Sequence, residues 1–251
     1  MRIGNRILRL ESCSSTNNIA KDLAADGEPE GTVVIAEEQK KGKGRLDRRW
    51  HSPRNEGLYL SLVLRPPGQD IPLLTLMGGV ALCEAVRKYG EDQICLKWPN
   101  DLLWRGKKLG GILCESSTAG ERLEYVILGI GLNISQDEES FPTDIRSAAV
   151  SLKQIGGVAP DPEEFLPLLW SRLDNWYDCF LSGLHQKIIS AFVERSCFLL
   201  GAKMEVETAG GRVAGLFHGI SSQGGLVLET AMGLKTYFAA EIRSRLGLEE
   251  I

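Results

Sequence analysis

The segment KKGKGRLDRRWHSP, residues 40–53, concentrates positive charge in a chain that is acidic overall. The 251 residues carry a formal net charge of −4, and the pI is near 5.6. Six cationic side chains fall within ten residues, opposed by Asp47 alone: Lys40, Lys41, Lys43, Arg45, Arg48 and Arg49. Gly42 and Gly44 make the backbone pliable, and lysine and arginine donate strong charge-assisted hydrogen bonds to phosphate oxygens. The pattern indicates a phosphate-binding loop, and a solvated charged surface is the alternative.

A second polar cluster lies in the sequence KWPND, residues 97–101. Its proline ends a strand, which leaves Asn100 and Asp101 at the tip as oxygen ligands of the kind that a magnesium–phosphate complex accepts. The next segment, GKKLGGILCE (106–115), puts Lys108 at the start of an adjacent strand, followed by a glycine pair that leaves room beside the backbone. These residues predict a ligand site at the strand ends, with an ordinary polar hairpin as the alternative.

Two further stretches suit a neutral ligand with hydrogen-bonding edges. SSTN (14–17) and Gln39 offer hydroxyls and amides, and GIGLN (129–133) has glycines within a strand, where they often mark a close backbone approach. The basic loop is not a Walker loop, because G-x-x-x-x-G-K-[ST] is absent from the sequence. Gly129 and Gly131 lack the third glycine of a dinucleotide fingerprint.

The elements that must hold these residues follow from apolar periodicity and from helix caps. The expected helices cover about 16–27, 72–88, 161–183 and 185–199, and the expected strands cover 32–38, 57–66, 94–99, 108–115 and 124–134. Residues 135–150 lack periodicity, so we expect a mobile loop there. Beyond residue 201, short strand-like runs alternate with glycine-rich turns, which predicts a small antiparallel barrel or sheet. The expected domains are therefore 1–200 and 201–251.

Composition argues against several classes of protein. Hydrophobic residues make up 43% of the chain and charged residues 25%, as in an ordinary globular protein. No apolar run approaches the roughly 20 residues of a membrane helix, and the start has no signal-peptide pattern. The three histidines are far apart, which gives a zinc site or a Ser-His-Asp hydrolase little support. Six cysteines are scattered without a C-x-x-C pair, so we expect free thiols in a reducing cytoplasm: Cys13, Cys83, Cys95, Cys114, Cys179 and Cys197.

Taken together, S-T-N, EEQKKGKGRLDRRWHSP, KWPNDLLWRGKKLGGILCE and VILGIGLNIS resemble, in this order, the catalytic module of the biotin–protein ligases, from about residue 14 to 133. The resemblance implies an α+β fold: a mixed β-sheet packed with helices, similar to class II synthetases, followed by a small SH3-like β-barrel. It implies a ligase that activates biotin with ATP and Mg²⁺ to biotinyl-5′-AMP. The biotin then passes to a lysine of a biotin carboxyl carrier protein.

The resemblance also assigns roles, residue by residue. The catalytic residues would be Lys108, Arg45 and Arg48. Biotin would be bound by Ser15, Thr16, Asn17, Gln39, Gly42, Lys43, Lys108, Gly111, Gly129 and Gly131. ATP would be bound by Arg45, Arg48, Trp50, Asn100, Asp101, Lys108 and Asn133, with Asp101 serving the metal. Lys108, on a strand, would be a fixed charge, and Arg45, on a loop, a movable one that helps to seal the labile adenylate from water.

Three positions depart from the family pattern G-R-G-R-x-G-R-x-W and its C-terminal motif. Lys43 replaces an arginine, which keeps the charge but loses the bidentate geometry. Asp47 stands where glycine is common, and aspartate tolerates unusual backbone angles better than most residues. The segment FAAEI (238–242) lacks a glycine before its glutamate.

The resemblance also bears on partners. Larger ligases of the family carry a DNA-binding domain ahead of S-T-N, whereas about 13 residues precede it here, so we expect neither a repressor nor nucleic-acid binding. The family makes a homodimer compatible with the sequence, and no membrane partner is expected. A lipoate ligase is the nearest alternative, and a non-catalytic nucleic-acid-binding module is an alternative of another class.

Overall fold

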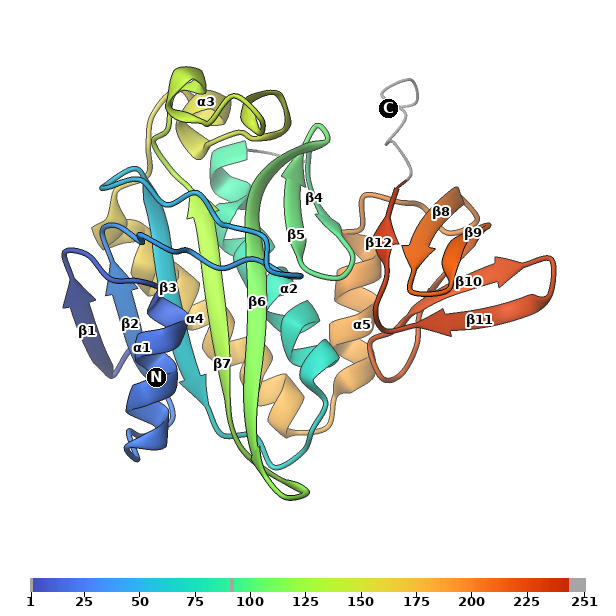
Figure 1. The fold of residues 1–251 in the computed structure, drawn as a ribbon, viewed down its shortest axis with the longest axis horizontal. Coiled ribbons are helices and arrows are strands. Elements are labelled where there is room, and N and C mark those ends of the chain that lie inside the picture. The colour runs from blue at the N-terminus through green and yellow to red at the C-terminus, as the bar shows by residue number, and fades with distance from the viewer. Residues whose placement is uncertain (1, 91–92, 244–251) are drawn as a thin grey trace.

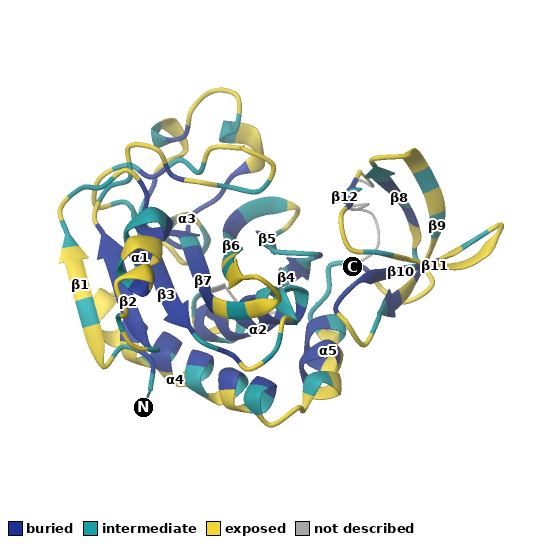
Figure 2. Ribbon diagram, turned by 60° about the horizontal axis from the view of Figure 1, so that its bottom comes forward, coloured by how far each residue is buried: buried dark blue, intermediate teal, exposed yellow. Residues whose placement is uncertain are grey.

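A seven-stranded mixed sheet forms the larger part of the computed structural model, which describes residues 2–90 and 93–243 (Figure 1). Its strand order is β1-β2-β3-β7-β6-β5-β4; β1 and β2 are parallel, and the other neighbours are antiparallel. The strands are β1 (Arg6–Leu10), β2 (Thr32–Ala36), β3 (Gly57–Leu64), β4 (Ile94–Lys97), β5 (Asp101–Trp104), β6 (Lys107–Ala119) and β7 (Arg122–Asn133). The central strands β2, β3 and β7 are largely buried, as their apolar sequences require (Figure 2).

Helices cover both faces of this sheet. Helix α1 (Thr16–Ala25) packs its alanines on β2, β3 and β7 in a small apolar cluster of its own. The main core lies on the other side, under α2 (Ile71–Gly90), α4 (Pro162–Leu181) and α5 (His185–Glu194). Helix α4 begins as its sequence predicts: the Asp161 side chain accepts a hydrogen bond from the backbone N–H of Glu163, and proline follows the cap.

The C-terminal region forms a second, separate sheet of five antiparallel strands in the order β11-β10-β9-β8-β12. The strands are β8 (Lys203–Thr208), β9 (Gly211–Ile220), β10 (Leu226–Thr230), β11 (Gly233–Tyr237) and β12 (Glu241–Ile242). The predicted α+β fold class is confirmed, and this sheet is consistent with the predicted SH3-like barrel. The division into domains 1–200 and 201–251 stays a prediction, and residues 244–251 lie outside the described part of the chain.

Some elements were not predicted from the sequence. Strand β1 is an edge strand with exposed arginines, and β5 has four residues, so neither shows a long apolar run. Because β5 lies between β4 and β6, the strand that begins at Lys107 is not next to the one that ends before Pro99. The segment 135–150 contains two 3-10 helices, η2 (Glu138–Ser140) and η3 (Arg146–Ala148), and the short helix α3 (Leu152–Gly156) follows it.

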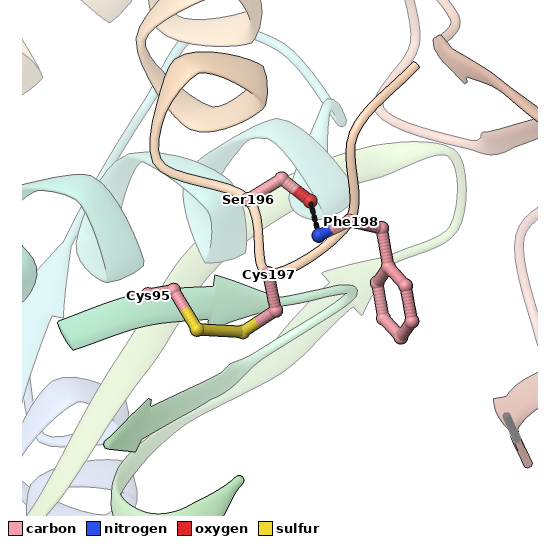
Figure 3. Close-up of a disulfide and its surroundings, with 4 residues drawn as sticks. All are labelled: Cys95, Ser196, Cys197 and Phe198. Carbon is pink, nitrogen blue, oxygen red and sulfur yellow. Dashed lines mark hydrogen bonds between the residues drawn. A yellow bond between two sulfur atoms is a disulfide. The ribbon is translucent and has the colours of Figure 1, made fainter. Parts of the chain in front are cut away.

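The expectation of six free thiols is wrong for one pair. Cys95 on β4 and Cys197, in the segment between α5 and β8, form a disulfide across 102 residues of sequence (Figure 3). Backbone pairing brings them together, because Leu96 N–H donates to Arg195 O and Cys197 N–H donates to Leu96 O. This pairing is tertiary and leaves no trace in the spacing of the cysteines. The thiols of Cys13, Cys83, Cys114 and Cys179 are free.

Within the described residues, no helix is both long enough and apolar enough to span a membrane.

Candidate active site

The sheet register assembles the predicted site residues from distant parts of the sequence. Asp101 on β5 pairs with Gly111 on β6, and Gly111 pairs with Gly131 on β7. Two residues further along β7, Gly129 pairs with Ser61 on β3. The carboxylate, the glycines and the Ser61 hydroxyl therefore occupy adjacent rows of one sheet surface.

The basic segment lies between β2 and β3 and folds into a narrow turn (Figure 1). Trp50 N–H donates to Gly42 O at 2.9 Å, and Gly44 N–H donates to Arg48 O at 2.7 Å. At its tip, Leu46 and Asp47 have φ angles of +54° and +58°. Asp47 thus adopts the left-handed conformation expected of a residue that replaces glycine. The same conformation at Leu46 was not predicted.

A cavity of about 330 Å³ lies between this turn, the sheet and the C-terminal strands. That volume is within the range of small-molecule sites. Its lining includes all the predicted site residues except Gly42: Ser15, Thr16, Asn17, Gln39, Lys43, Arg45, Arg48, Trp50, Asn100, Asp101, Lys108, Gly111, Gly129, Gly131 and Asn133. The Gly42 backbone instead packs against Trp50 O and the Ser52 hydroxyl.

One end of the cavity is cationic. Lys108 Nζ lies 2.6 Å from Asp101 Oδ1 and 5.4 Å from the centre of the Trp50 ring. Arg45 Nη1 lies 3.5 Å from Asn100 Oδ1. Burial lowers the pKa of the Arg45 guanidinium, and the nearby carboxylate of Asp101 opposes that shift. Burial likewise lowers the pKa of Lys97, an additional cation at this end that was not predicted.

Arg48 connects the basic turn to the C-terminal sheet. Its Nη2 lies 2.8 Å from both carboxylate oxygens of Glu241 on β12. Hydrogen bonding from Arg48 holds the pKa of Glu241 below its usual value. A second contact joins the C-terminal region to the connection between β4 and β5, because the buried Trp98 Nε1–H donates to Gly224 O at 3.0 Å. The C-terminal sheet is thus held against the cationic end of the cavity.

The other end is polar but largely uncharged. Gln39 Oε1 accepts from the Thr16 backbone N–H at 2.8 Å, and Gln39 Nε2 donates to the Ser52 hydroxyl at 2.9 Å. The Ser61 hydroxyl lies 2.8 Å from Thr16 Oγ1 and 2.5 Å from Asn17 Oδ1. Hydroxyl and amide groups with fixed directions can recognise both donors and acceptors on a ligand.

Two strand glycines are required by the packing of this site. A Cβ on Gly129 would lie 2.2 Å from Asn17 Oδ1, and one on Gly131 would lie 2.5 Å from Trp50 Cε2. Both distances are far inside van der Waals contact. The predicted close approach at these glycines is therefore made here by side chains of the chain itself, and Trp50 lies directly over Gly131.

The model of the biotin/lipoate A/B protein ligase family matches residues 10–133. The bifunctional ligase/repressor BirA of Bacillus spizizenii is 35% identical over 242 residues, covering 96% of this chain and 74% of the relative. This chain belongs to the biotin/lipoate A/B protein ligase family.

Two other similar proteins match this chain over nearly their whole length. A biotin–[acetyl-CoA-carboxylase] ligase of Paracoccus denitrificans is 33% identical over 93% of this chain and 98% of the relative. The biotin protein ligase of Aquifex aeolicus, solved in complex with biotin and ATP, has a TM-score of 0.83 and 29% identity, covering 96% of this chain and 100% of that one. The membership and the enzyme class predicted from the sequence are confirmed.

Several side chains at this family member's cavity were missed by sequence reasoning. Phe141, Ile145 and Ala148, from the segment expected to be a loop, line it, and His51 Nε2 contacts Ser140 O at 3.1 Å. The buried Asn133 Nδ2–H donates to Val150 O at 3.0 Å, so Asn133 anchors this segment to β7. The available signal was the presence of the isolated apolar residues Phe141 and Ile145 in an otherwise polar stretch. Ser61 lies inside an apolar strand, where a single hydroxyl attracts no notice.

Proposed function

We propose that this chain is a biotin–protein ligase that forms biotinyl-5′-AMP from biotin and ATP and transfers biotin to a lysine of a carrier protein. The observation that carries the proposal is the chemistry of the cavity, which has a neutral hydrogen-bonding end and a cationic end. A ligand with an uncharged polar ring at one end and a carboxylate at the other matches these two ends of the cavity. Biotin has that form, and two of the relatives reported above are named for biotin, which favours it over lipoate.

The neutral end suits the ureido ring. Thr16 and Gln39, which line the cavity, present a hydroxyl and an amide in directions fixed by hydrogen bonds, and a ureido group has two N–H donors and one carbonyl acceptor. Gly129 and Gly131 let Asn17 and Trp50 pack directly on the sheet, so these two side chains wall the place where the ring would lie. The indole Nε1 of Trp50 is buried with no hydrogen-bond partner in the described residues, so a ligand at the cavity would give it one.

The cationic end suits the attack of one anion on another. The biotin carboxylate oxygen bonds to the α-phosphorus of ATP, and the bond to pyrophosphate breaks. Lys108 and Arg45 place positive charge where negative charge accumulates, and such preorganised charge is a large contribution to catalysis. Asp101 is the residue that would hold Mg²⁺ carried by the ATP phosphates, where the ion supplies charge neutralisation; ATP-bound Mg²⁺ commonly uses one or two protein carboxylates.

In the second step, the amine of the carrier lysine attacks the carbonyl of the mixed anhydride. An amide forms, AMP leaves, and the nitrogen loses a proton. The acceptor is proposed to be a biotin carboxyl carrier domain. The homodimer, the cytoplasmic location and the absence of repressor activity stay predictions.

The test is biotin-dependent exchange between ATP and labelled pyrophosphate. We expect exchange with biotin and Mg²⁺, and at least tenfold less with lipoate at equal concentration. Incubation with a carrier domain should add one biotin mass to one lysine. Exchange that requires lipoate, or no exchange with either vitamin, would overturn the proposal.

A further inference from the structure

Glu115 on β6 is outside the residues assigned to the site, yet its carboxylate contacts two of them. Glu115 Oε2 accepts a hydrogen bond from Asn17 Nδ2 at 2.7 Å, and Glu115 Oε1 lies 3.2 Å from Lys43 Nζ. Asn17 is on α1 and is buried, and Lys43 belongs to the basic turn. The Glu115 side chain is 32% exposed. One carboxylate thus links the neutral end of the cavity to the cationic segment that covers it.

The contact with Asn17 determines the direction of a chain of hydrogen bonds. An ionised carboxylate can only accept, so the Asn17 amide must turn its NH₂ group toward Glu115 and its oxygen toward Ser61. The Ser61 hydroxyl, 2.5 Å from that oxygen, then gives its single hydrogen to Asn17. Ser61 Oγ is then left as an acceptor, so the single hydrogen of the Thr16 hydroxyl goes to Ser61 Oγ, 2.8 Å away, or to Gln39 Oε1, 3.1 Å away.

With either partner Thr16 gives its only hydrogen to a neighbour in the protein, and both of its lone pairs are available to accept from a ligand in the cavity. Without the carboxylate, the Asn17 amide could rotate by 180° and donate to Ser61. The Ser61 hydroxyl would then donate to Thr16 Oγ1 and occupy one of the lone pairs that Thr16 offers to the ligand. That loss matters in this site, because Thr16, Asn17 and Ser61 are buried and a ligand N–H left without an acceptor there does not recover the hydrogen bond it made to water.

We propose that Glu115 is a positioning residue that sets the hydrogen-bond polarity of Asn17, Ser61 and Thr16, so that Thr16 accepts from an N–H group of the substrate ring. Its ion pair with Lys43 holds the basic turn over the same ring. The inference rests on the proposed function, since it identifies the ligand edge at this end as a hydrogen-bond donor. A ureido N–H satisfies that requirement.

The test measures the dissociation constant of biotin by calorimetry, together with KM and kcat for pyrophosphate exchange. For Glu115→Ala we expect the dissociation constant to rise about ten- to hundredfold, because a charge-assisted hydrogen bond and the direction of the chain are lost together. Most of the loss should fall on KM for biotin rather than on kcat. Glu115→Gln keeps a group that can accept from Asn17, and it should fall between Glu115→Ala and the wild type.

Two comparisons separate polarity from structural support. A biotin analogue with an oxygen in place of one ureido N–H should lose affinity in the wild type, and that loss should shrink in Glu115→Ala. Ser61→Ala interrupts the chain of hydrogen bonds and leaves the Glu115 carboxylate in place, so adding Glu115→Gln to Ser61→Ala should weaken biotin binding little further. Ser61→Ala keeps the test decisive if Glu115→Ala does not fold. Glu124→Gln, on the neighbouring strand and paired with the Ser117 hydroxyl, is the matched control and should bind biotin as the wild type does.

A further comparison tests the ion pair between Glu115 and Lys43. If Glu115→Ala weakens biotin binding equally in the wild type and in Lys43→Ala, the polarity role is supported. If the effect disappears in Lys43→Ala, Glu115 acts by holding the turn alone, and the polarity proposal is wrong. Unchanged affinity in both Glu115→Ala and Ser61→Ala would also overturn it. Failure of the proposed function looks different, because the wild type itself would then bind no biotin.

Discussion

Replacing Lys108 by methionine removes the fixed positive charge of the cavity while keeping most of the side-chain stem. Lys108 Nζ lies 2.6 Å from Asp101 Oδ1 and 5.4 Å from the Trp50 ring centre, and the side chain is 39% exposed. The ammonium is therefore set between a carboxylate and an aromatic face before any substrate arrives. Methionine can still pack on Trp50, so the change tests charge rather than volume.

The expected loss can be worked out in two ways. Two unit charges 4 Å apart interact by about 4 kcal/mol at an effective dielectric constant near 20. Without the Lys108 ammonium, about that much of the repulsion between the biotin carboxylate and the α-phosphate would no longer be offset. Removing one preorganised donor at an enzyme site typically costs about 10²–10³-fold in rate, or about 2.7–4 kcal/mol. Both values predict that Lys108→Met lowers kcat for adenylate formation by about 10²–10³-fold.

The assay is biotin-dependent pyrophosphate exchange at saturating biotin and ATP. Lys107→Met is the matched control: it removes the same charge one residue earlier on β6, and Lys107 is not among the described residues that line the cavity. We expect the control to stay within about twofold of the wild type. Equal losses in the two variants would show that net charge, rather than a placed ammonium, explains the effect. Near-normal exchange in Lys108→Met would refute its role.

Other changes test the basic turn and the disulfide. Arg45→Gly removes the contact with Asn100, so we expect biotinyl-5′-AMP to escape and label bystander lysines several-fold more than in the wild type. Mass spectrometry of a non-carrier protein measures this labelling. Lys41→Gly is the control and should retain the intermediate. Retention by Arg45→Gly would argue against a lid. The Cys95–Cys197 bond closes a loop of 102 residues, for which chain entropy gives about 4.7 kcal/mol, so a reducing agent should lower Tm by about 10 °C or more. The Tm of the variant with both Cys95→Ser and Cys197→Ser should not change with the reductant, and the Tm of Cys179→Ser should fall as in the wild type. A wild-type Tm that does not change with the reductant would contradict the disulfide.

The parts of the fold that sequence patterns predicted are those with a strong local signal. Helix α4 has an acidic cap, a proline and a repeated apolar face, and its observed start at Pro162 agrees with them. Strand β5 has four residues between a polar tip and a glycine turn, which is too short for a period to show. Disulfide formation depends on how β4 meets the segment after α5, and no local pattern encodes that contact.

The residues of the site also differ in whether a local sequence pattern could predict them. Motif residues such as Lys108, Asp101 and Trp50 were predicted because a family resemblance identifies them, and the structure brings them to one cavity. Their individual roles remain predictions. Glu115 and Glu241 were not predicted, because each acts on a residue far away in the sequence: Glu115 on Asn17 and Glu241 on Arg48. Partners of this kind follow from sheet register and from the packing of the second sheet, which a one-dimensional pattern does not contain.

The backbone conformation and the contacts of the basic turn bear on its proposed role as a lid. Leu46 has a φ of +54° although it is 73% exposed, so no packing compensates a conformation that costs an ordinary residue about 1–2 kcal/mol. Against that cost stand three contacts of neighbouring cations: Lys43 with Glu115, Arg45 with Asn100 and Arg48 with Glu241. Exposed ion pairs such as those of Lys43 and Arg48 contribute about 0–1 kcal/mol each. The cost at Leu46 and the gain from these pairs are similar in size. For the proposed lid, this balance predicts that phosphate oxygens attracting Arg45 and Arg48 are enough to favour the closed position.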